Sequence, residues 1–157
     1  MRVGQGYDVH PFDDGKSLVL GGVAFEGEPG LAGHSDGDAL THAIIDALLG
    51  AAALGDIGSH FPSSDEKLKG ADSIELLKRV CRLLAAKGCR IANVDTIVVA
   101  EKPRMAPRVG EMQARLAFAM GLELTQVSVK ATTTDGLGAI GRGEGIAAQA
   151  VALVEEA

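Results

Sequence analysis

Residues 146–154, with the sequence IAAQAVALV, are apolar at almost every position. A strand with one covered face is apolar at every second position, whereas a strand buried on both faces shows a nearly continuous apolar run. We therefore predict a strand here that is covered on both sides. In a chain of only 157 residues another subunit can supply the second cover, so this segment favours an oligomer.

The rest of the chain mixes strand and helix patterns. Short strands are predicted over 2–9, 17–25, 90–100 and 126–132, from β-branched and apolar runs bounded by Gly and Pro. Apolar residues at helical spacing predict helices over 38–53, 73–87 and 107–120, the last two ended by Gly88 and Gly121. Residues 26–37 are a Gly-rich loop, and 54–72 have no clear period. This mixture indicates an α/β or α+β domain.

Length and charge limit the functions that the chain can have. We expect one domain over residues 1–157, large enough to bury a core without disulfides. Cys81 and Cys89 are not in a C-x-x-C pair, so buried thiols in the cytoplasm are expected. No apolar run reaches the roughly 18 residues of a membrane span. The net charge of -6 excludes a basic face for nucleic acid, and an anionic substrate would need local cations or metal ions.

Asp8, His10 and His42 are the best candidates for a metal site. Asp8 and His10 are two residues apart in a predicted strand, so their side chains point to one face. His42 lies off the apolar stripe of its helix, with Asp46 one turn later. Two nitrogens and one oxygen leave a fourth position open, as in catalytic zinc sites, and Asp46 would orient His42. The alternatives are two polar residues at a strand end and a hydrogen-bonded, partly buried histidine.

Three loops carry further candidate residues. In GHSDGDAL (33–40), Asp36 or Asp38 is the expected N-cap, and His34 and Ser35 remain to hold substrate oxygens. In VKATTTDG (129–136), hydroxyl groups can cradle a phosphate and Asp135 can hold Mg²⁺. Arg142, in the Gly-rich GRGEG, suits a phosphate. The alternative for the threonines is ordinary strand composition. The alternative for residues 55–65 and for the basic loop AEKPRM (100–105) is a solvent-exposed loop without a binding role.

Taken in order, seven motifs resemble the 2-C-methyl-D-erythritol 2,4-cyclodiphosphate synthases, the cyclising enzymes of the non-mevalonate isoprenoid pathway. They are GYDVH, GHSDGDALTHAIIDALLGAAALGDIG, FPSSD, KGADS, KPRM, KATTTDGLG and GRGEG, and they cover essentially the whole chain. The resemblance implies a homotrimer with active sites between subunits. It also implies a mixed four-stranded sheet with helices packed on one face, plus a small β-hairpin.

The resemblance also assigns roles to residues. Asp8, His10 and His42 match zinc ligands, Asp135 matches a ligand of magnesium or manganese, and His34 and Thr133 match residues that assist the transition state. Residues 56–58 and 61–65 match the part that receives methylerythritol phosphate, and 100–106 with 131–133 match a cytidine pocket from the adjacent subunit. The implied substrate-binding set is Asp8, His10, His34, Ser35, Asp56, Ile57, Gly58, Phe61, Ser63, Ser64, Asp65, Ala100, Pro103, Arg104, Met105, Ala106, Ala131, Thr132, Thr133, Thr134, Asp135, Ala139 and Arg142.

Four positions depart from the family pattern. Asp135 stands where Glu is more common, Ser63 replaces the Asp of FPDTD, and Arg104 replaces a common Lys. Ala139 replaces a larger residue near the trimer axis, where the family can hold an isoprenoid diphosphate, whereas Arg142 is retained.

The implied reaction is an intramolecular cyclisation. In 4-diphosphocytidyl-2-C-methyl-D-erythritol 2-phosphate, the 2-phosphate attacks the β-phosphorus and CMP leaves, so no nucleophilic side chain is needed. One alternative is a zinc-dependent hydrolase of phosphate esters or diphosphates, with His34 or Asp56 as general base. A non-catalytic trimeric protein that binds a metal or ligand is the other.

Overall fold

A computed structural model describes residues 1–156, and five strands in it form one sheet in the order β2-β1-β5-β3-β4. The strands are β1 (Arg2–Leu20), β2 (Val23–Leu31), β3 (Cys89–Val99), β4 (Val127–Thr132) and β5 (Gly145–Glu156). Only β3 and β4 run parallel; the other neighbouring pairs are antiparallel. The α+β class and the mixed sheet are confirmed.

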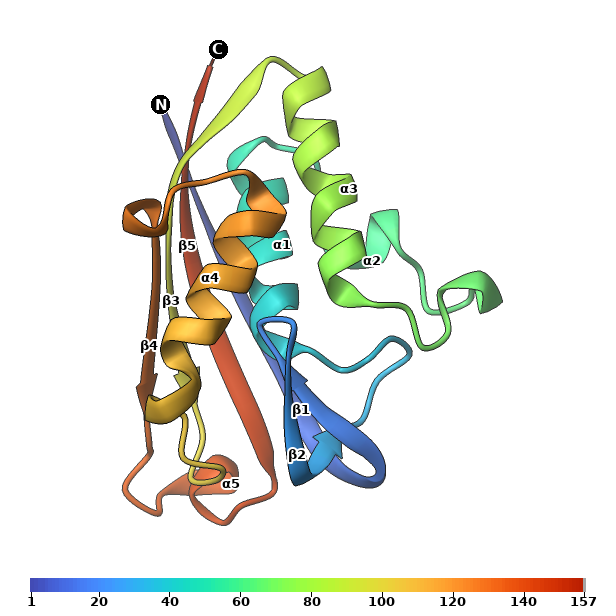
Figure 1. Ribbon diagram of the computed structural model, residues 1–157. Coiled ribbons are helices and arrows are strands. Elements are labelled where there is room, and N and C mark those ends of the chain that lie inside the picture. Colours follow the sequence, from blue (N-terminus) through green and yellow to red (C-terminus); the bar gives the residue numbers. More distant parts are fainter. Residues whose placement is uncertain (157) are drawn as a thin grey trace.

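Helices α1 (Ala39–Ala51), α3 (Ser73–Ala86) and α4 (Val109–Met120) lie on one face of this sheet (Figure 1). Each lies within two residues of the helix predicted from the sequence. Asp38 and Asp72 cap the first two, and Gly121, at φ 68°, ends the third. The shorter helices are α2 (Ile57–His60), α5 (Gly138–Gly141) and single 3₁₀ turns at Glu66–Leu68, Ala106–Arg108 and Leu124–Gln126. Two of these short elements, α2 and the 66–68 turn, lie in the segment 54–72, which showed no period.

The expected count of four strands plus a separate hairpin is wrong, because β1 is longer than its sequence suggests. Its first part, Arg2–Pro11, pairs with β5, and its second part continues to Leu20 and pairs with β2. Pro11 does not end the strand: its carbonyl accepts a hydrogen bond from the Ala32 N–H, and the neighbouring Phe12 N–H donates to the Glu144 carbonyl.

The boundaries at 17–25 and 26–37 change for the same reason. The predicted strand at 17–25 is in fact a hairpin, with a turn at Gly21 and Gly22, whose φ angles of 57° and 71° suit glycine. The segment 26–37, expected to be all loop, supplies β2 as far as Leu31.

Helix α1 packs directly on β1 and β5 and is buried along most of its length. Gly4 and Gly6 of β1 face this helix, and a methyl group at either position would overlap the carbonyl oxygen of Ala47 or Ala43. Because side chains alternate along a strand, Asp8 and His10 point to the same face as these glycines. The close approach of the two backbones therefore brings the first turn of α1 to the Asp8–His10 pair.

The opposite face of the sheet is apolar and exposed. Val3, Tyr7 and Val9 of β1 are 67%, 55% and 48% exposed, and Val151 of β5 is 46% exposed. In β5 the first four residues are all buried, and from Ala148 onward the buried residues alternate with more exposed ones, as at Ala150 and Ala152. The expectation that both faces of β5 are covered is therefore met only at the start of the strand, and beyond Ala148 only the helix side is covered. Among residues 1–156, no helix has the length and apolar character needed to cross a membrane.

Replacing Gly6 with Ala tests the contact between α1 and β1. We expect Gly6→Ala to lower the free energy of unfolding by about 2 kcal/mol, because the added methyl must push the helix backbone away. Gly50→Ala is the matched control: Gly50 lies in α1, is exposed, and has nothing within 4 Å of the added methyl. It should raise stability by up to about 1 kcal/mol. Urea denaturation measures both variants, and equal effects would contradict the proposed close contact.

Candidate functional site

The candidate site is built where the first turn of α1 meets β1. Asp38, the buried N-cap of α1, accepts hydrogen bonds from the Thr41 N–H (2.9 Å) and the Thr41 hydroxyl (2.7 Å). It also accepts from the N–H groups of Gly21 (2.9 Å) and Gly22 (2.8 Å). One carboxylate thus joins the hairpin turn to the start of the helix, one turn before His42. Of the two expected cap candidates, Asp38 is the cap, and Asp36 has other partners.

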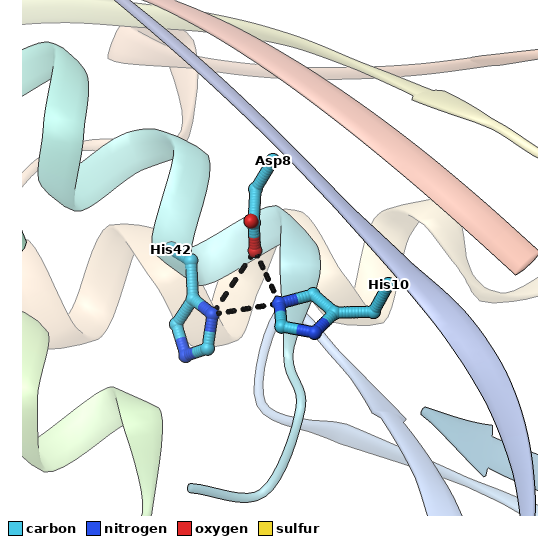
Figure 2. A group of neighbouring side chains, drawn as sticks. All are labelled: Asp8, His10 and His42. Carbon is cyan, nitrogen blue, oxygen red and sulfur yellow. Dashed lines mark hydrogen bonds and ion pairs between the residues drawn. The ribbon is translucent and has the colours of Figure 1, made fainter. Parts of the chain in front are cut away.

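Asp8, His10 and His42 converge on one point (Figure 2). The Oδ2 atom of Asp8 lies 2.7 Å from Nε2 of His10 and 3.0 Å from Nδ1 of His42. The two ring nitrogens are 3.4 Å apart. The sequence prediction that these three side chains meet is therefore confirmed.

The hydrogen bond made by Nδ1 of His10 shows which nitrogen of the ring carries the lone pair. Its Nδ1 lies 2.5 Å from the carbonyl oxygen of Ala32, which can only accept a hydrogen bond. Nδ1 therefore carries the proton in the neutral ring, and the Nε2 lone pair points toward Asp8 and His42. A carboxylate and two imidazoles aimed at one point form a donor set that suits zinc and related divalent ions. The side chains fit such an ion and leave further coordination positions to a substrate.

In the absence of an ion, the two histidines change the acidity of Asp8. Burial raises the pKa of Asp8, but the hydrogen bonds from His10 and His42, together with their charges, outweigh burial and lower the pKa to about 2. The hydrogen bond to Asp8 is also the main reason that the pKa of His10 is raised above 6.5, against the effect of burial.

Asp46 does not orient His42, contrary to the expectation from their spacing. Its Oδ1 accepts a hydrogen bond from the Ile57 N–H (2.7 Å), which holds the start of α2. Burial is the main reason that its pKa is raised. The outer nitrogen of His42, Nε2, instead lies 2.8 Å from the Ser73 hydroxyl and 3.1 Å from the Ser35 hydroxyl.

A hollow of about 240 Å³ opens beside the three side chains. The residues lining it that the sequence singled out are Asp8, His10, His34, Ser35, His42, Ile57, Gly58, Phe61 and Ser63. His34 is held by a hydrogen bond of 2.9 Å between its Nε2 and the carbonyl of Asp65. Asp56 caps α2 through Ser59, Asp65 caps the 3₁₀ turn at 66–68, and Ser64 is exposed.

The remaining predicted site residues lie together elsewhere in the chain. They lie at or after the carboxyl ends of the parallel strands β3 and β4, or in and directly after α5: Ala100, Pro103, Arg104, Met105, Ala106, Ala131, Thr132, Thr133, Thr134, Asp135, Ala139 and Arg142. Glu101 links the loop after β3 to the loop after β4, because its carboxylate accepts hydrogen bonds from the Thr134 N–H (2.9 Å) and the Thr134 hydroxyl (3.1 Å). Within residues 1–156, no member of the group lines the hollow beside His42, and β4 lies at the far edge of the sheet from β2.

Comparison with known proteins identifies the family. A sequence profile described as the YgbB family matches residues 1–155. The chain belongs to the YgbB family. A curated relative, the 2-C-methyl-D-erythritol 2,4-cyclodiphosphate synthase of Synechococcus sp. (strain JA-2-3B'a(2-13)), is 58% identical over 156 residues, or 99% of each chain.

Solved structures give the same result. The bifunctional IspDF from Campylobacter jejuni superposes with a TM-score of 0.96 at 41% identity, and the match covers 99% of this chain and 42% of that one. A CDP complex of IspF from Plasmodium falciparum superposes with a TM-score of 0.86 at 34% identity, covering 99% of this chain and 96% of that one. The resemblance to the cyclodiphosphate synthases is therefore confirmed.

Sequence reasoning missed one residue that contacts the site from outside, Ser73. Ser73 follows the N-cap Asp72, so it was read only as the start of a helix, yet its hydroxyl contacts His42. The available signal was its place at the end of the KGADS motif, for which no role had been found.

The pKa shifts predict how the stability of the metal-free protein depends on pH. Since the pKa of His10 is raised, its pairing with Asp8 stabilises the fold fully below pH 6.5. This stabilisation is lost as the pH rises through the raised pKa. Since the pKa of Asp8 is lowered, its contribution is present above 3.8 and is lost as pH falls toward about 2. In thermal unfolding with EDTA, the melting temperature of wild type should exceed that of Asp8→Asn by the largest amount between pH 3.8 and pH 6.5. A difference independent of pH would contradict the pairing.

Proposed function

We propose that this protein converts 4-diphosphocytidyl-2-C-methyl-D-erythritol 2-phosphate to 2-C-methyl-D-erythritol 2,4-cyclodiphosphate and CMP, as a metal-dependent phosphorus–oxygen lyase. One observation carries the proposal: Asp8, His10 and His42 direct donor atoms to one point beside a hollow of about 240 Å³. The full-length identity to named cyclodiphosphate synthases supports it. We also propose that residues 1–157 act as one domain.

The reaction forms one P–O bond and breaks another. An oxygen of the 2-phosphate bonds to the β-phosphorus, and the bond from that phosphorus to the bridging oxygen breaks, so that CMP leaves with the electron pair. Two like charges about 4 Å apart repel by roughly 4 kcal/mol at an effective dielectric of 20. Zinc held by Asp8, His10 and His42, and magnesium or manganese held by Asp135, would when bound neutralise charge on the diphosphate.

The side chains around the hollow orient the substrate. Ile57 and Phe61 supply apolar surface for the methylerythritol carbons, and His34 and Ser35 offer polar groups to its phosphate oxygens. Positive charge also lies close by, although the chain as a whole is acidic. Lys16 and Lys69 line a neighbouring pocket of about 450 Å³ that shares His34 and Ser35 with the hollow. These residues favour an anionic substrate and hold its two phosphates near each other.

The second group of residues completes the site from an adjacent subunit of a homotrimer. In one chain the segments 100–106 and 131–135 do not line the hollow, so a neighbouring copy would have to bring its own. The exposed apolar residues Val3, Tyr7, Val9 and Val151 supply a face for such contacts. We assign the cytidine to residues 100–106 and 131–133, with Thr133 assisting the reaction and Ala139 and Arg142 nearer the axis. The CDP complex of the Plasmodium falciparum protein supports a cytidine nucleotide as ligand.

A zinc-dependent hydrolase is less well supported, because both candidate general bases already have structural roles. Nε2 of His34 is hydrogen bonded to the carbonyl of Asp65, and Asp56 accepts from the Ser59 N–H (2.8 Å) and the Ser59 hydroxyl (2.6 Å). The full-length relative from Synechococcus is moreover named a cyclodiphosphate synthase, not a hydrolase.

Replacing His42 tests the proposed reaction. With Zn²⁺ and Mg²⁺, purified wild type should release CMP and a cyclic diphosphate, identified by ³¹P NMR and mass spectrometry. His42→Ala should lose bound zinc and at least about 1,000-fold in rate, because one ligand in three is removed. His60→Ala is the control, since His60 is hydrogen bonded to Leu54 outside the site. A linear phosphate product would support the hydrolase, and no turnover by wild type would support a binding protein.

Replacing Asp135 tests the second cation. Asp135 is exposed and has φ 53°, a conformation that Asn tolerates, so Asp135→Asn should fold normally while losing the carboxylate. We expect the variant to need at least about 10-fold more Mg²⁺ or Mn²⁺ for half-maximal CMP release, because the ion loses a charged ligand. Asp95→Asn, which removes an exposed partner of Lys130, is the control. Equal cation requirements would remove Asp135 from the site.

A further inference from the structure

We infer that Ser73, held by Asp36, is a positioning residue that keeps the proton of His42 on Nε2 and so leaves Nδ1 free for a divalent cation. The inference rests on the cation site of the proposed function but does not depend on which reaction the site performs. It assigns a role to two residues that are neither metal ligands nor part of the substrate hollow.

Asp36 makes two hydrogen bonds to Ser73 that fix the direction of the Ser73 hydroxyl. Ser73 is the fully buried first residue of α3, and its N–H donates to Oδ2 of Asp36 (2.9 Å). The other oxygen, Oδ1, accepts from the Asp38 N–H (3.1 Å) and lies within hydrogen-bond distance of the Ser73 hydroxyl. Both oxygens therefore receive backbone N–H groups, which is the environment of an ionised carboxylate. An ionised carboxylate can only accept, so the hydroxyl proton of Ser73 points to Asp36.

This direction determines the proton position on His42. With its own proton directed to Asp36, the Ser73 oxygen offers only a lone pair to Nε2 of His42, 2.8 Å away. Nε2 must then carry the hydrogen. A neutral imidazole has one N–H group, so Nδ1 is left bare. Nδ1 is the atom that faces Asp8 and His10.

Ser73 is needed because a second group pulls the proton the other way. Oδ2 of Asp8 lies 3.0 Å from Nδ1 of His42 and would accept a hydrogen bond from it. In that tautomer the proton would occupy the point where the three donor atoms meet. The Asp36–Ser73 pair opposes this, as the Ala32 carbonyl does for His10.

Ser35 is a natural control for this role. Its hydroxyl also lies near Nε2 of His42, at 3.1 Å, but it has no other hydrogen bond among the described residues. A hydroxyl without a second partner can donate or accept, so Ser35 accommodates either tautomer of His42. Both serines contact the same nitrogen, and only Ser73 selects its protonation.

The test compares Ser73→Ala with Ser35→Ala in two measurements. Zinc affinity, from competition with a chelator, should fall about 10- to 100-fold in Ser73→Ala and less than about 3-fold in Ser35→Ala. In the metal-free proteins at about pH 8.5, two units above the ordinary pKa of imidazole, long-range ¹H–¹⁵N NMR reports the tautomer of His42. The Nε2–H population should be lower in Ser73→Ala than in wild type or Ser35→Ala.

Two results would overturn the inference: unchanged zinc affinity in Ser73→Ala, or the same His42 tautomer population in all three proteins. Neither measurement involves the substrate, so a failed cyclisation assay with an intact tautomer difference would count against the proposed reaction alone. If Ser73→Ala does not fold, Ser73→Cys replaces it. The thiol nearly preserves the volume but is a weak hydrogen-bond acceptor, so the same fall in the Nε2–H population is expected. The tautomer is the only measurement for this variant, because a thiol can itself bind zinc.

Discussion

The site depends on the contact between α1 and β1, where a helix lies on a strand with no side chain between them at two positions. Gly4 and Gly6 make this possible, because any larger residue would meet the backbone of α1. The same alternation that turns these glycines toward the helix turns Asp8 and His10 toward it as well. Packing and ligand placement are therefore one constraint. The Asp38 carboxylate holds the start of α1 against the turn at Gly21 and Gly22. This contact fixes the position of α1 along β1, and therefore the position of His42 opposite Asp8 and His10.

Hydrogen bonding outside the three side chains is as specific as the contacts among them. Each imidazole has an inner nitrogen that faces Asp8 and an outer nitrogen held by another segment of the chain. The outer partners come from the end of β2 and the start of α3, so two distant segments control the donor atoms. Two backbone hydrogen bonds, from the Gly70 N–H to the His34 carbonyl and from the Asp36 N–H to the Ala71 carbonyl, join the loop 33–36 to the segment 70–73. These bonds place Asp36 beside Ser73.

The sequence allowed good predictions wherever the cause is local. Helix ends followed from Asp caps and from Gly121, and the shared face of Asp8 and His10 followed from the alternation of side chains along a strand. Errors arose where distant partners decide the outcome. The predicted strand stopped at residue 9, before Pro11, but hydrogen bonds with Ala32, directly after β2, and Glu144, directly before β5, keep the chain extended. Asp46 lies one turn after His42, yet the Ile57 N–H is its hydrogen-bond partner. Ser73 was missed because its role depends on Asp36, 37 residues earlier in the chain.

The position of the second residue group follows from the order of the strands. Because β5 and β3 separate β1 from β4, the residues that follow β4 cannot line the hollow beside β1 in the same chain. Yet Thr133 and Asp135 are mostly exposed, and the Glu101 carboxylate holds their loop through the N–H groups of Thr134 and Gly136. Exposed side chains on a fixed loop are suited to contact with a molecule outside the chain. The helix-free face of the sheet is apolar and exposed over β1 and β5. A neighbouring copy that covered this face could also bring its own 131–135 loop to the hollow. In the proposed trimer, burial of an apolar surface and completion of the active site are therefore two results of the same contact.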